Sequence, residues 1–250
     1  LTFISTKVLI NHGLTPQEIF FYRFLIAYLG IWVISPKRLF TNNWQDELWL
    51  VAGGIFGGSL YFFTENTALG ITQASNVSFI ICTAPLLTTI LSLLFYKSEK
   101  ASKGLIYGSL LALMGVGLIV FNGSFVLKIS PIGDLLTLLA ALSWAFYSLI
   151  IKKMAGRYPT IFITRKIFFY GVLTILPAFL LHPLHPDTVV LLQPAVLFNL
   201  LFLAVLASLI CYVLWNVVLK QLGTVRASNY IYLNPLVTMI ASFLILDEKI

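Results

Sequence analysis

The sequence predicts an all-α integral membrane protein built from two halves of five helices each, related as an inverted repeat. The chain of 250 residues is 59% hydrophobic and only 10% charged, whereas a soluble domain carries about 25% charged residues. Apolar runs of about 20 residues, the length that crosses a bilayer as a helix, recur along the chain. Since lipid leaves backbone polar groups without partners, these runs are expected to be helical. The third observation is that the second half of the chain repeats the first.

The repeat is clearest at a shift of 150 residues. Positions 66–94 then fall on positions 216–244 with ten identities in 29 positions. Shared apolar composition can match leucine with leucine by accident, but it does not readily align polar residues and a proline in one register. The polar and proline matches include Asn66 with Asn216, Ser78 with Ser228 and Pro85 with Pro235.

The helices can be placed in order along the chain. Residues 1–10 look like the second half of a spanning helix. We expect a first repeat at 1–122 with helices 1–5, of which helix 1 is partial, and a second repeat at 131–250 with helices 6–9 and helix 10 missing. An odd number of spans per repeat makes the two copies enter the membrane from opposite sides. The other expected spans are 16–35, 48–70, 74–96, 103–121, 131–152, 160–181, 194–219 and 225–246.

The second span is also repeated, because a shift of 143 residues places Pro16 on Pro159 and Arg23 on Lys166.

The distribution of basic residues predicts how the bundle is oriented in the membrane. Ten basic residues lie in the loops that follow helices 2, 4, 6 and 8, whereas only Lys128 lies in the loops that follow helices 1, 3, 5 and 7. The positive-inside rule therefore places these loops and the N-terminus in the cytoplasm, with the chain a multi-pass protein of the cell (inner) membrane. The ten are Lys37, Arg38, Lys97, Lys100, Lys103, Lys152, Lys153, Arg157, Lys220 and Arg226.

Several short motifs recur in this framework. Helix 2 carries the stretch Phe21–Phe24, Pro85 leads to a loop with Glu99, and helix 9 carries Asn234–Leu236 followed by Leu246–Glu248. Together with the two five-helix halves, these motifs resemble the EamA family of the drug/metabolite transporter superfamily. The family's usual Gly-Glu after the fourth and ninth helices is replaced here by Ser98-Glu99 and Asp247-Glu248.

The resemblance implies a secondary active transporter that moves small polar metabolites, amino acids or related compounds, across the cytoplasmic membrane by alternating access, with export expected. The partners would be the metabolite, membrane lipid, protons as a coupling ion, and a second copy of the chain in a homodimer. Nucleic acid is not expected as a partner, since membrane orientation accounts for the net charge of +7. An integral-membrane enzyme and a non-transporting scaffold or receptor remain alternatives. We expect no enzyme activity, cofactor or metal.

Three charged residues inside the predicted spans, Lys7, Arg23 and Glu65, form the sharpest candidate site. A charge in the middle of a span costs about 2.5–3.5 kcal/mol even on a permissive scale. One interpretation is a structural ion pair with side chains that reach toward the interface. The other is a substrate or proton site in which Glu65 pairs with Arg23 and Lys7 joins them.

Polar and aromatic residues of the spans complete the candidate substrate site, because lipid would leave polar side chains unsatisfied. Hydrogen bonds between helices and aromatic anchors at the membrane interface are the alternative explanations. The predicted substrate-binding set is Arg23, Glu65, Asn66, Asn76, Ser78, Trp144, Tyr147, Tyr212, Trp215, Asn216, Ser228, Tyr232 and Asn234.

Pro85 and Pro235 are predicted hinges, because proline inside a helix removes a hydrogen bond and bends it; static kinks are the alternative. The glycines of Gly53–Gly58 predict close helix packing. We interpret His182, His185 and Asp187 as a loop and not as metal ligands. The two cysteines, Cys82 and Cys211, do not correspond under the repeat, so no disulfide framework is expected.

Overall fold

The computed structural model describes residues 1–36, 40–41, 43–96, 107–108, 110–111, 114–115, 130–181, 183–184 and 188–246. Every regular element in these ranges is helical. Most of the predicted helix at 103–121 lies outside the described residues, as do Lys37, Arg38 and the predicted loop residues of 97–100, 182, 185–187 and 247–250.

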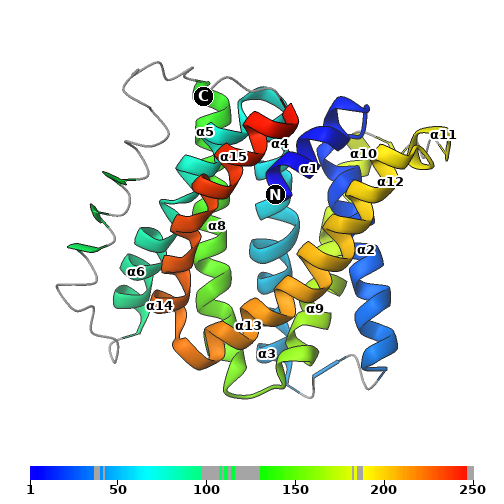
Figure 1. The fold of residues 1–250 in the computed structure, drawn as a ribbon. Coiled ribbons are helices and arrows are strands. Elements are labelled where there is room, and N and C mark those ends of the chain that lie inside the picture. The colour runs from blue at the N-terminus through cyan, green and yellow to red at the C-terminus, as the bar shows by residue number, and fades with distance from the viewer. Residues whose placement is uncertain are drawn as a thin grey trace.

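The first half contains helices that correspond to the predicted spans (Figure 1). The third predicted span is one long helix with a π-helical segment, η1, between α3 and α4, and the fourth is broken into α5 and α6. The bounds are α1 Thr2–Asn11, α2 Pro16–Ile34, α3 Trp44–Gly54, η1 Ile55–Ser59, α4 Leu60–Ile71, α5 Ala74–Ile81 and α6 Ala84–Phe95.

The second half repeats this pattern. A second π-helical segment, η2, lies inside the eighth span, and the ninth span is broken by a 3-10 segment, η3. The bounds are α8 Pro131–Ala155, α9 Thr160–Ile175, α10 Ala178–Leu181, α11 Thr188–Leu191, α12 Pro194–Leu201, η2 Phe202–Ile210, α13 Cys211–Leu222, α14 Thr224–Ser228, η3 Asn229–Leu233 and α15 Asn234–Leu246.

Local sequence explains where α2 begins. Thr15 and Glu18 form a capping box, in which the Glu18 amide donates to Thr15 Oγ1 and the Thr15 amide donates to the Glu18 carboxylate at 2.9 Å. Pro16 occupies the first turn, where a missing N–H is tolerated. These three residues fix the entry of the helix that carries Arg23.

Six helical stretches in the described part of the chain are long and apolar enough to cross a membrane. The helix over Trp44–Ile71, predicted as a span at 48–70, is not among the six. Its polar side chains, Glu65 and Asn66 among them, lower its apolar character. Helix α1 has only ten residues. The six stretches are Pro16–Ile34, Ala74–Phe95, Pro131–Ala155, Thr160–Leu180, Pro194–Leu222 and Thr224–Ile245.

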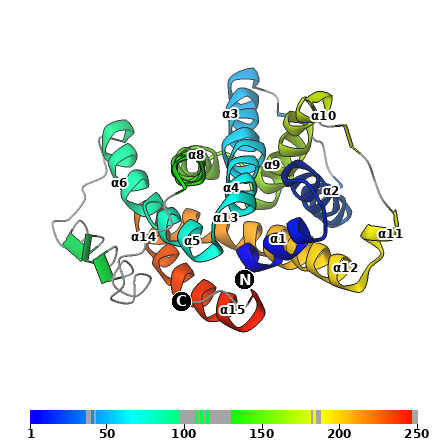
Figure 2. The same cartoon turned by 90° about the horizontal axis from the view of Figure 1, so that it is seen from above.

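The helices pack closely at the glycines of η1 and its neighbours. Seen along the bundle, α3 and α4 lie between α8 on one side and α9 with α2 on the other (Figure 2). A methyl group added at Gly57 would overlap the Tyr147 ring of α8, and one at Gly54 would overlap Tyr170 of α9. The expected role of Gly53–Gly58 in close packing is therefore confirmed.

Hydrogen bonds identify two opposite ends of the bundle. At the first, which we call the Thr72 end, Lys7 Nζ donates to the Thr72 carbonyl at 2.8 Å and Asn76 donates to Asp134 at 2.7 Å. Near it, Asn66 donates to the Pro16 carbonyl at 3.1 Å. Helices α2, α5 and α8 therefore begin at the Thr72 end, the upper end in Figure 1.

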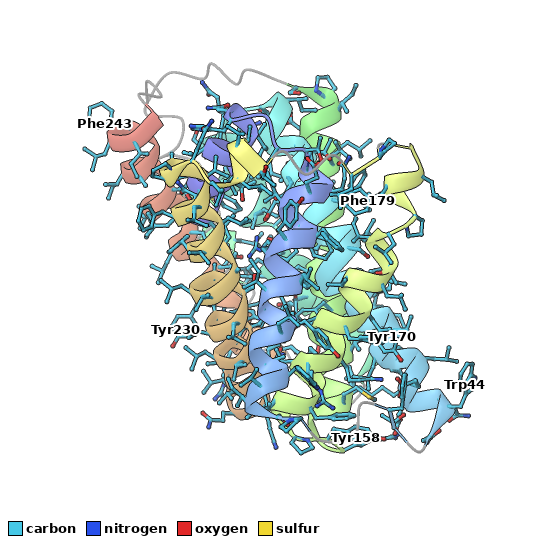
Figure 3. The ribbon with its side chains drawn as sticks, turned by 90° about the vertical axis from the view of Figure 1, so that its right-hand side faces the viewer. Trp44, Tyr158, Tyr170, Phe179, Tyr230 and Phe243 are labelled. Carbon is cyan, nitrogen blue, oxygen red and sulfur yellow. The ribbon has the colours of Figure 1, made fainter. Side chains whose placement is uncertain are left out.

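At the other end, which we call the Glu47 end, α3 and α9 begin. Arg157 donates to Asp46 at 2.5 Å, and Tyr158 donates to the same carboxylate at 2.8 Å. Trp44 and Tyr158 lie together at this end in Figure 3, far from Phe179. Helix α9, the predicted counterpart of α2, thus begins at the end opposite to the start of α2.

The helix breaks occur at the predicted prolines. Helix α5 ends at Ile81, and Pro85 lies in the first turn of α6. In the second half, Pro235 is the second residue of α15, directly after η3. Proline is favoured in a first helical turn, so each proline begins a new helical segment inside its span.

Candidate functional site

A cavity of about 270 Å³ lies between the two halves of the chain. Its walls come from α1, α2, α4, α5 and α6 of the first half and from α8, η2, α13, η3 and α15 of the second. The lining residues are Thr2, Phe3, Arg23, Tyr61, Phe62, Glu65, Ile81, Ala84, Trp144, Ala207, Cys211, Tyr212, Trp215, Tyr230, Ile231 and Asn234.

Arg23 is the buried cation of this cavity, with an exposed fraction of 1%. Its Nε donates to Ser208 Oγ of η2 at 2.9 Å, and its guanidinium carbon lies 4.1 Å from the centre of the Phe62 ring. Nη1 has no hydrogen-bond partner in the described part of the chain. Ser208 and Phe62 therefore hold the guanidinium in place while part of its donor capacity stays unused.

Glu65 lines the same cavity and is also buried. Its Oε1 accepts a hydrogen bond from the Tyr61 hydroxyl, one turn earlier on α4. Among the described residues, no ion pair joins Glu65 to Arg23. Arg23 and Glu65 therefore share one cavity without a direct ion pair. Arg23 donates to Ser208 and lies against the Phe62 ring, while the Tyr61 hydroxyl donates to Glu65.

Lys7 does not join this site. It does not line the cavity, and its ammonium donates to the Thr72 carbonyl at the end of α4. A lysine next to the carboxyl end of a helix is stabilised by the helix dipole. Lys7 is therefore not one of the residues that line the cavity.

Aromatic rings form much of the cavity wall. The centre of the Trp144 ring lies 4.9 Å from the centre of the Tyr61 ring, 5.7 Å from that of the Trp215 ring and 5.8 Å from that of the Tyr212 ring. The Tyr212 hydroxyl donates to the Gly57 carbonyl in η1 at 2.5 Å. The indole N–H groups of Trp144 and Trp215 have no partner among the described residues. Most of the wall surface is therefore apolar, but the wall also carries indole N–H groups that have no acceptor among the described residues.

Six of the thirteen residues predicted to bind substrate line the cavity: Arg23, Glu65, Trp144, Tyr212, Trp215 and Asn234. The other seven do not, and they are Asn66, Asn76, Ser78, Tyr147, Asn216, Ser228 and Tyr232. These seven are buried within the bundle.

Several of those seven form hydrogen bonds that hold the bundle together. Tyr147 of α8 donates to Asn216 Oδ1 at 2.7 Å, and Asn216 donates to Thr164 of α9 at 2.9 Å. Ser228 donates to the Thr224 carbonyl of its own helix at 2.7 Å. For these residues and for Asn66 and Asn76, packing between and within helices is the better explanation.

A second buried cation lies near the Glu47 end. Lys166 of α9 is fully buried and forms an ion pair with Glu47, and the Tyr170 hydroxyl donates to the same carboxylate oxygen. Thr41 donates to the other oxygen of Glu47 through its amide at 2.9 Å and its hydroxyl at 2.6 Å. Neither Lys166 nor Glu47 lines the cavity.

The sequence interpretation did not assign Tyr61, Phe62 and Ser208 to the site. Tyr61 precedes Glu65 by four residues, which places both on one helix face, so this spacing could have found it. The pairing of Lys166 with Glu47 was also missed. Lys166 lies early in the predicted span 160–181 and Glu47 just before the span 48–70, so both were expected near one membrane face.

In the part of the chain that the structure describes, no group of three or more His, Cys, Asp or Glu side chains could hold a metal ion. Cys82 and Cys211 are both free. The cavity offers one guanidinium, one carboxyl group and aromatic walls.

The fold and the cavity define a class, that of multi-pass helical membrane proteins with a central polar and aromatic cavity. Residues 1–121 and 131–250 each match the model of the EamA-like transporter family. The chain therefore belongs to this family.

Relatives agree with this membership. An uncharacterized transporter of Archaeoglobus fulgidus is 30% identical, with 99% of this chain and 85% of the relative covered. A probable amino-acid metabolite efflux pump of Escherichia coli K12 is 22% identical, with 100% of this chain and 84% of the relative covered. A solved crystal structure shares the fold with a TM-score of 0.72 at 18% identity, covering 97% of this chain and 85% of that one.

Proposed function

We propose that this protein is a secondary active transporter that carries small polar metabolites through its cavity by alternating access. The observation that carries the proposal is the cavity itself, which is lined from both halves and holds a buried guanidinium with an unused donor. Charged residues inside spanning helices mark substrate and ion pathways. The efflux pump among the relatives supports export of amino acids or related compounds.

An inverted repeat fits this function, because rocking of one repeat against the other opens a central site to each side in turn. The family model matches once in each half. The counterparts α2 and α9 begin at opposite ends of the bundle. In addition, a shift of 150 residues places η1 at 55–59 on 205–209, inside η2. These agreements support two copies of opposite orientation.

Pro85 and Pro235 are the proposed hinges. Each begins a helical segment directly beside the cavity, since Ala84 and Asn234, their neighbours in the chain, line it. A break in a helix is a place where a small change in backbone angles can reorient the rest of the element. Movement at the two breaks would change the shape of the cavity.

Glu65 is the proposed proton carrier that couples transport to the proton gradient. The titratable groups that line the cavity with it are Tyr61 on its own helix, Arg23 on α2, Cys211 and Tyr212 on α13, and Tyr230 on η3. A substrate anion that binds at Arg23 would offset the guanidinium charge and so favour the protonated form of Glu65. Protonation and substrate binding would then occur together.

The membrane orientation rests on charge. The Glu47 end carries Lys152, Lys153 and Arg157, so we place it in the cytoplasm of a cell whose inner membrane holds the protein. A homodimer stays a prediction. An enzyme or a scaffold would explain neither the paired helix breaks nor a cavity lined equally by both halves.

The native cysteines test alternating access. Cys211 lines the cavity, whereas Cys82 is fully buried away from it. In a Cys82→Ala background, we expect a membrane-impermeant maleimide to modify Cys211 in right-side-out vesicles and also in inside-out vesicles, because the cavity opens to each side in turn. Mass spectrometry of the intact protein measures the modified fraction.

The control is Cys211→Ser, which leaves only Cys82 and should stay unmodified from both sides. Modification of Cys211 from one side alone, at every time point, would contradict alternating access through this cavity.

A further inference from the structure

The fully buried side-chain atoms of the cavity lining that lack a partner among the described residues are all hydrogen-bond donors. Three buried side-chain atoms on its lining residues lack a hydrogen-bond partner within the described chain: Arg23 Nη1, Trp144 Nε1 and Trp215 Nε1. Guanidinium and indole nitrogens can only donate. The other unpartnered buried atoms belong to residues that do not line the cavity. A ligand that brings hydrogen-bond acceptors to these three atoms would satisfy them.

A buried donor without an acceptor is costly, and a ligand that supplies the acceptor removes that cost. The guanidinium is planar, which suits the two oxygens of a carboxylate. Ser208 and Phe62 already occupy its Nε and one face, so the side chain needs little reordering when a ligand arrives. This preorganisation favours an anionic group at Arg23.

The rest of the cavity suits an apolar, ring-shaped body. Tyr61, Phe62, Trp144, Tyr212 and Trp215 supply the wall. Tyr230 of η3 also lines the cavity, is 61% exposed, and lies at the outer edge of the bundle in Figure 3. A cavity of about 150 Å³ holds benzene, so 270 Å³ has room for a ring with a short acidic arm.

The carboxyl group of Glu65 does not make this a cation site. The Tyr61 hydroxyl already satisfies Glu65 Oε1. A ligand that carries only positive charge would face the Arg23 guanidinium and leave the three donors unpaired. A ligand with both charges could still place its ammonium group toward Glu65.

We infer that the ligand of this cavity is a small carboxylate with an apolar, aromatic body, held by Arg23 and the two indole N–H groups. This inference rests on the proposed function and gives its substrate class. The carboxylate could belong to a simple organic anion or to a zwitterionic amino acid, which share the chemistry that Arg23 recognises.

Three probes of one shape separate the charges: 3-phenylpropionate, L-phenylalanine and phenethylamine. Their dissociation constants would be measured by isothermal titration calorimetry on the full protein in nanodiscs. We expect both carboxylates to bind, and phenethylamine to bind at least about tenfold more weakly, since it leaves buried donors unpaired. Tighter binding of phenylalanine than of phenylpropionate would assign its ammonium group to Glu65.

Two variants test the named donors. Arg23→Gln should weaken both carboxylates by about tenfold or more, because it removes a charge-assisted hydrogen bond. Trp144→Phe keeps an aromatic ring but removes one donor, and should weaken them about threefold to tenfold. Trp32→Phe, at an exposed position outside the cavity, is the matched control and should bind as the wild type does.

Binding of phenethylamine as tight as that of the carboxylates would overturn the inference. So would failure of both carboxylates to bind, or carboxylate affinity unchanged in both Arg23→Gln and Trp144→Phe. The assay needs no transport, so its failure is distinct from failure of the proposed function, which the labelling of Cys211 tests.

Discussion

Two of the buried cations, Arg23 and Lys166, are brought into register by a shift of 143 residues, yet their surroundings differ. Lys166 forms an ion pair with the Glu47 carboxylate, and the Tyr170 hydroxyl donates to the same carboxylate oxygen. Arg23 donates to the Ser208 hydroxyl and lies over the face of the Phe62 ring, and its Nη1 has no hydrogen-bond partner among the described residues. The Lys166 charge is balanced within the protein, whereas we propose that the Arg23 charge is balanced by a ligand. The contrast favours a structural role for Lys166 and a binding role for Arg23.

The largest effect should come from breaking the balanced pair. Lys166→Met leaves the Glu47 carboxylate without its cation, and removing one partner of a buried ion pair costs about 3–5 kcal/mol. The free energy of unfolding, measured by titration with SDS, should fall by an amount at the lower end of that range, because Glu47 retains hydrogen bonds from Thr41 and Tyr170.

Arg23→Met is the comparison variant. It removes one hydrogen bond but also removes a buried donor that had no partner, so it should cost about 1 kcal/mol or less. If Arg23→Met destabilised the protein as much as Lys166→Met, the contrast between the two sites would be lost.

A smaller set of changes concerns Glu65. Glu65→Gln cannot exchange a proton, so transport by this variant should lose its dependence on pH while the protein still inserts and folds. The initial rate of transport across a series of pH values measures this. Tyr61→Phe removes the hydroxyl but keeps the carboxyl group, and should therefore remain pH-dependent. Wild-type pH dependence in Glu65→Gln would leave Glu65 as a structural group.

The smallest effect is expected at the hinge. Pro235→Ala restores a backbone donor and straightens the helix, which should lower turnover by about twofold to tenfold while abundance changes less. Pro131→Ala is the matched control, because Pro131 begins α8 at its first residue and no break follows it. Turnover equal to that of the wild type at matched abundance would support a static kink.

The sequence was sufficient for most of the described helices and for the helix breaks at Pro85 and Pro235, because both depend on local features. Apolar length predicts a span, and Pro85 and Pro235 mark the breaks. The partners of charged residues depend on which helix faces lie together, and apolar composition does not determine that. Arg23 and Glu65 do line one cavity, but their direct partners, Ser208 and Tyr61, were not predicted.

Sequence-based prediction is limited in the same way for the polar residues that form hydrogen bonds between or within helices. Asn76 and Ser228 stand out in an apolar run whether they face a cavity or another helix. Only the packed structure shows that Asn76 donates a hydrogen bond to Asp134 and that Ser228 donates one to the Thr224 carbonyl. Tyr61, in contrast, could have been found from its spacing to Glu65.

The central claim is that Arg23 anchors a substrate that the protein carries. The most direct measurement is metabolite profiling of the medium of cells that express the full protein, Arg23→Met or Lys220→Met at matched abundance in the membrane. Lys220 is an exposed cation in the last turn of α13 and serves as the control.

At least one small metabolite that bears a carboxylate should accumulate outside cells with the wild type and with Lys220→Met. Its export should fall about tenfold or more with Arg23→Met, because a charge-assisted hydrogen bond to the substrate is lost. Export by Arg23→Met at the wild-type rate for every exported metabolite would contradict the claim.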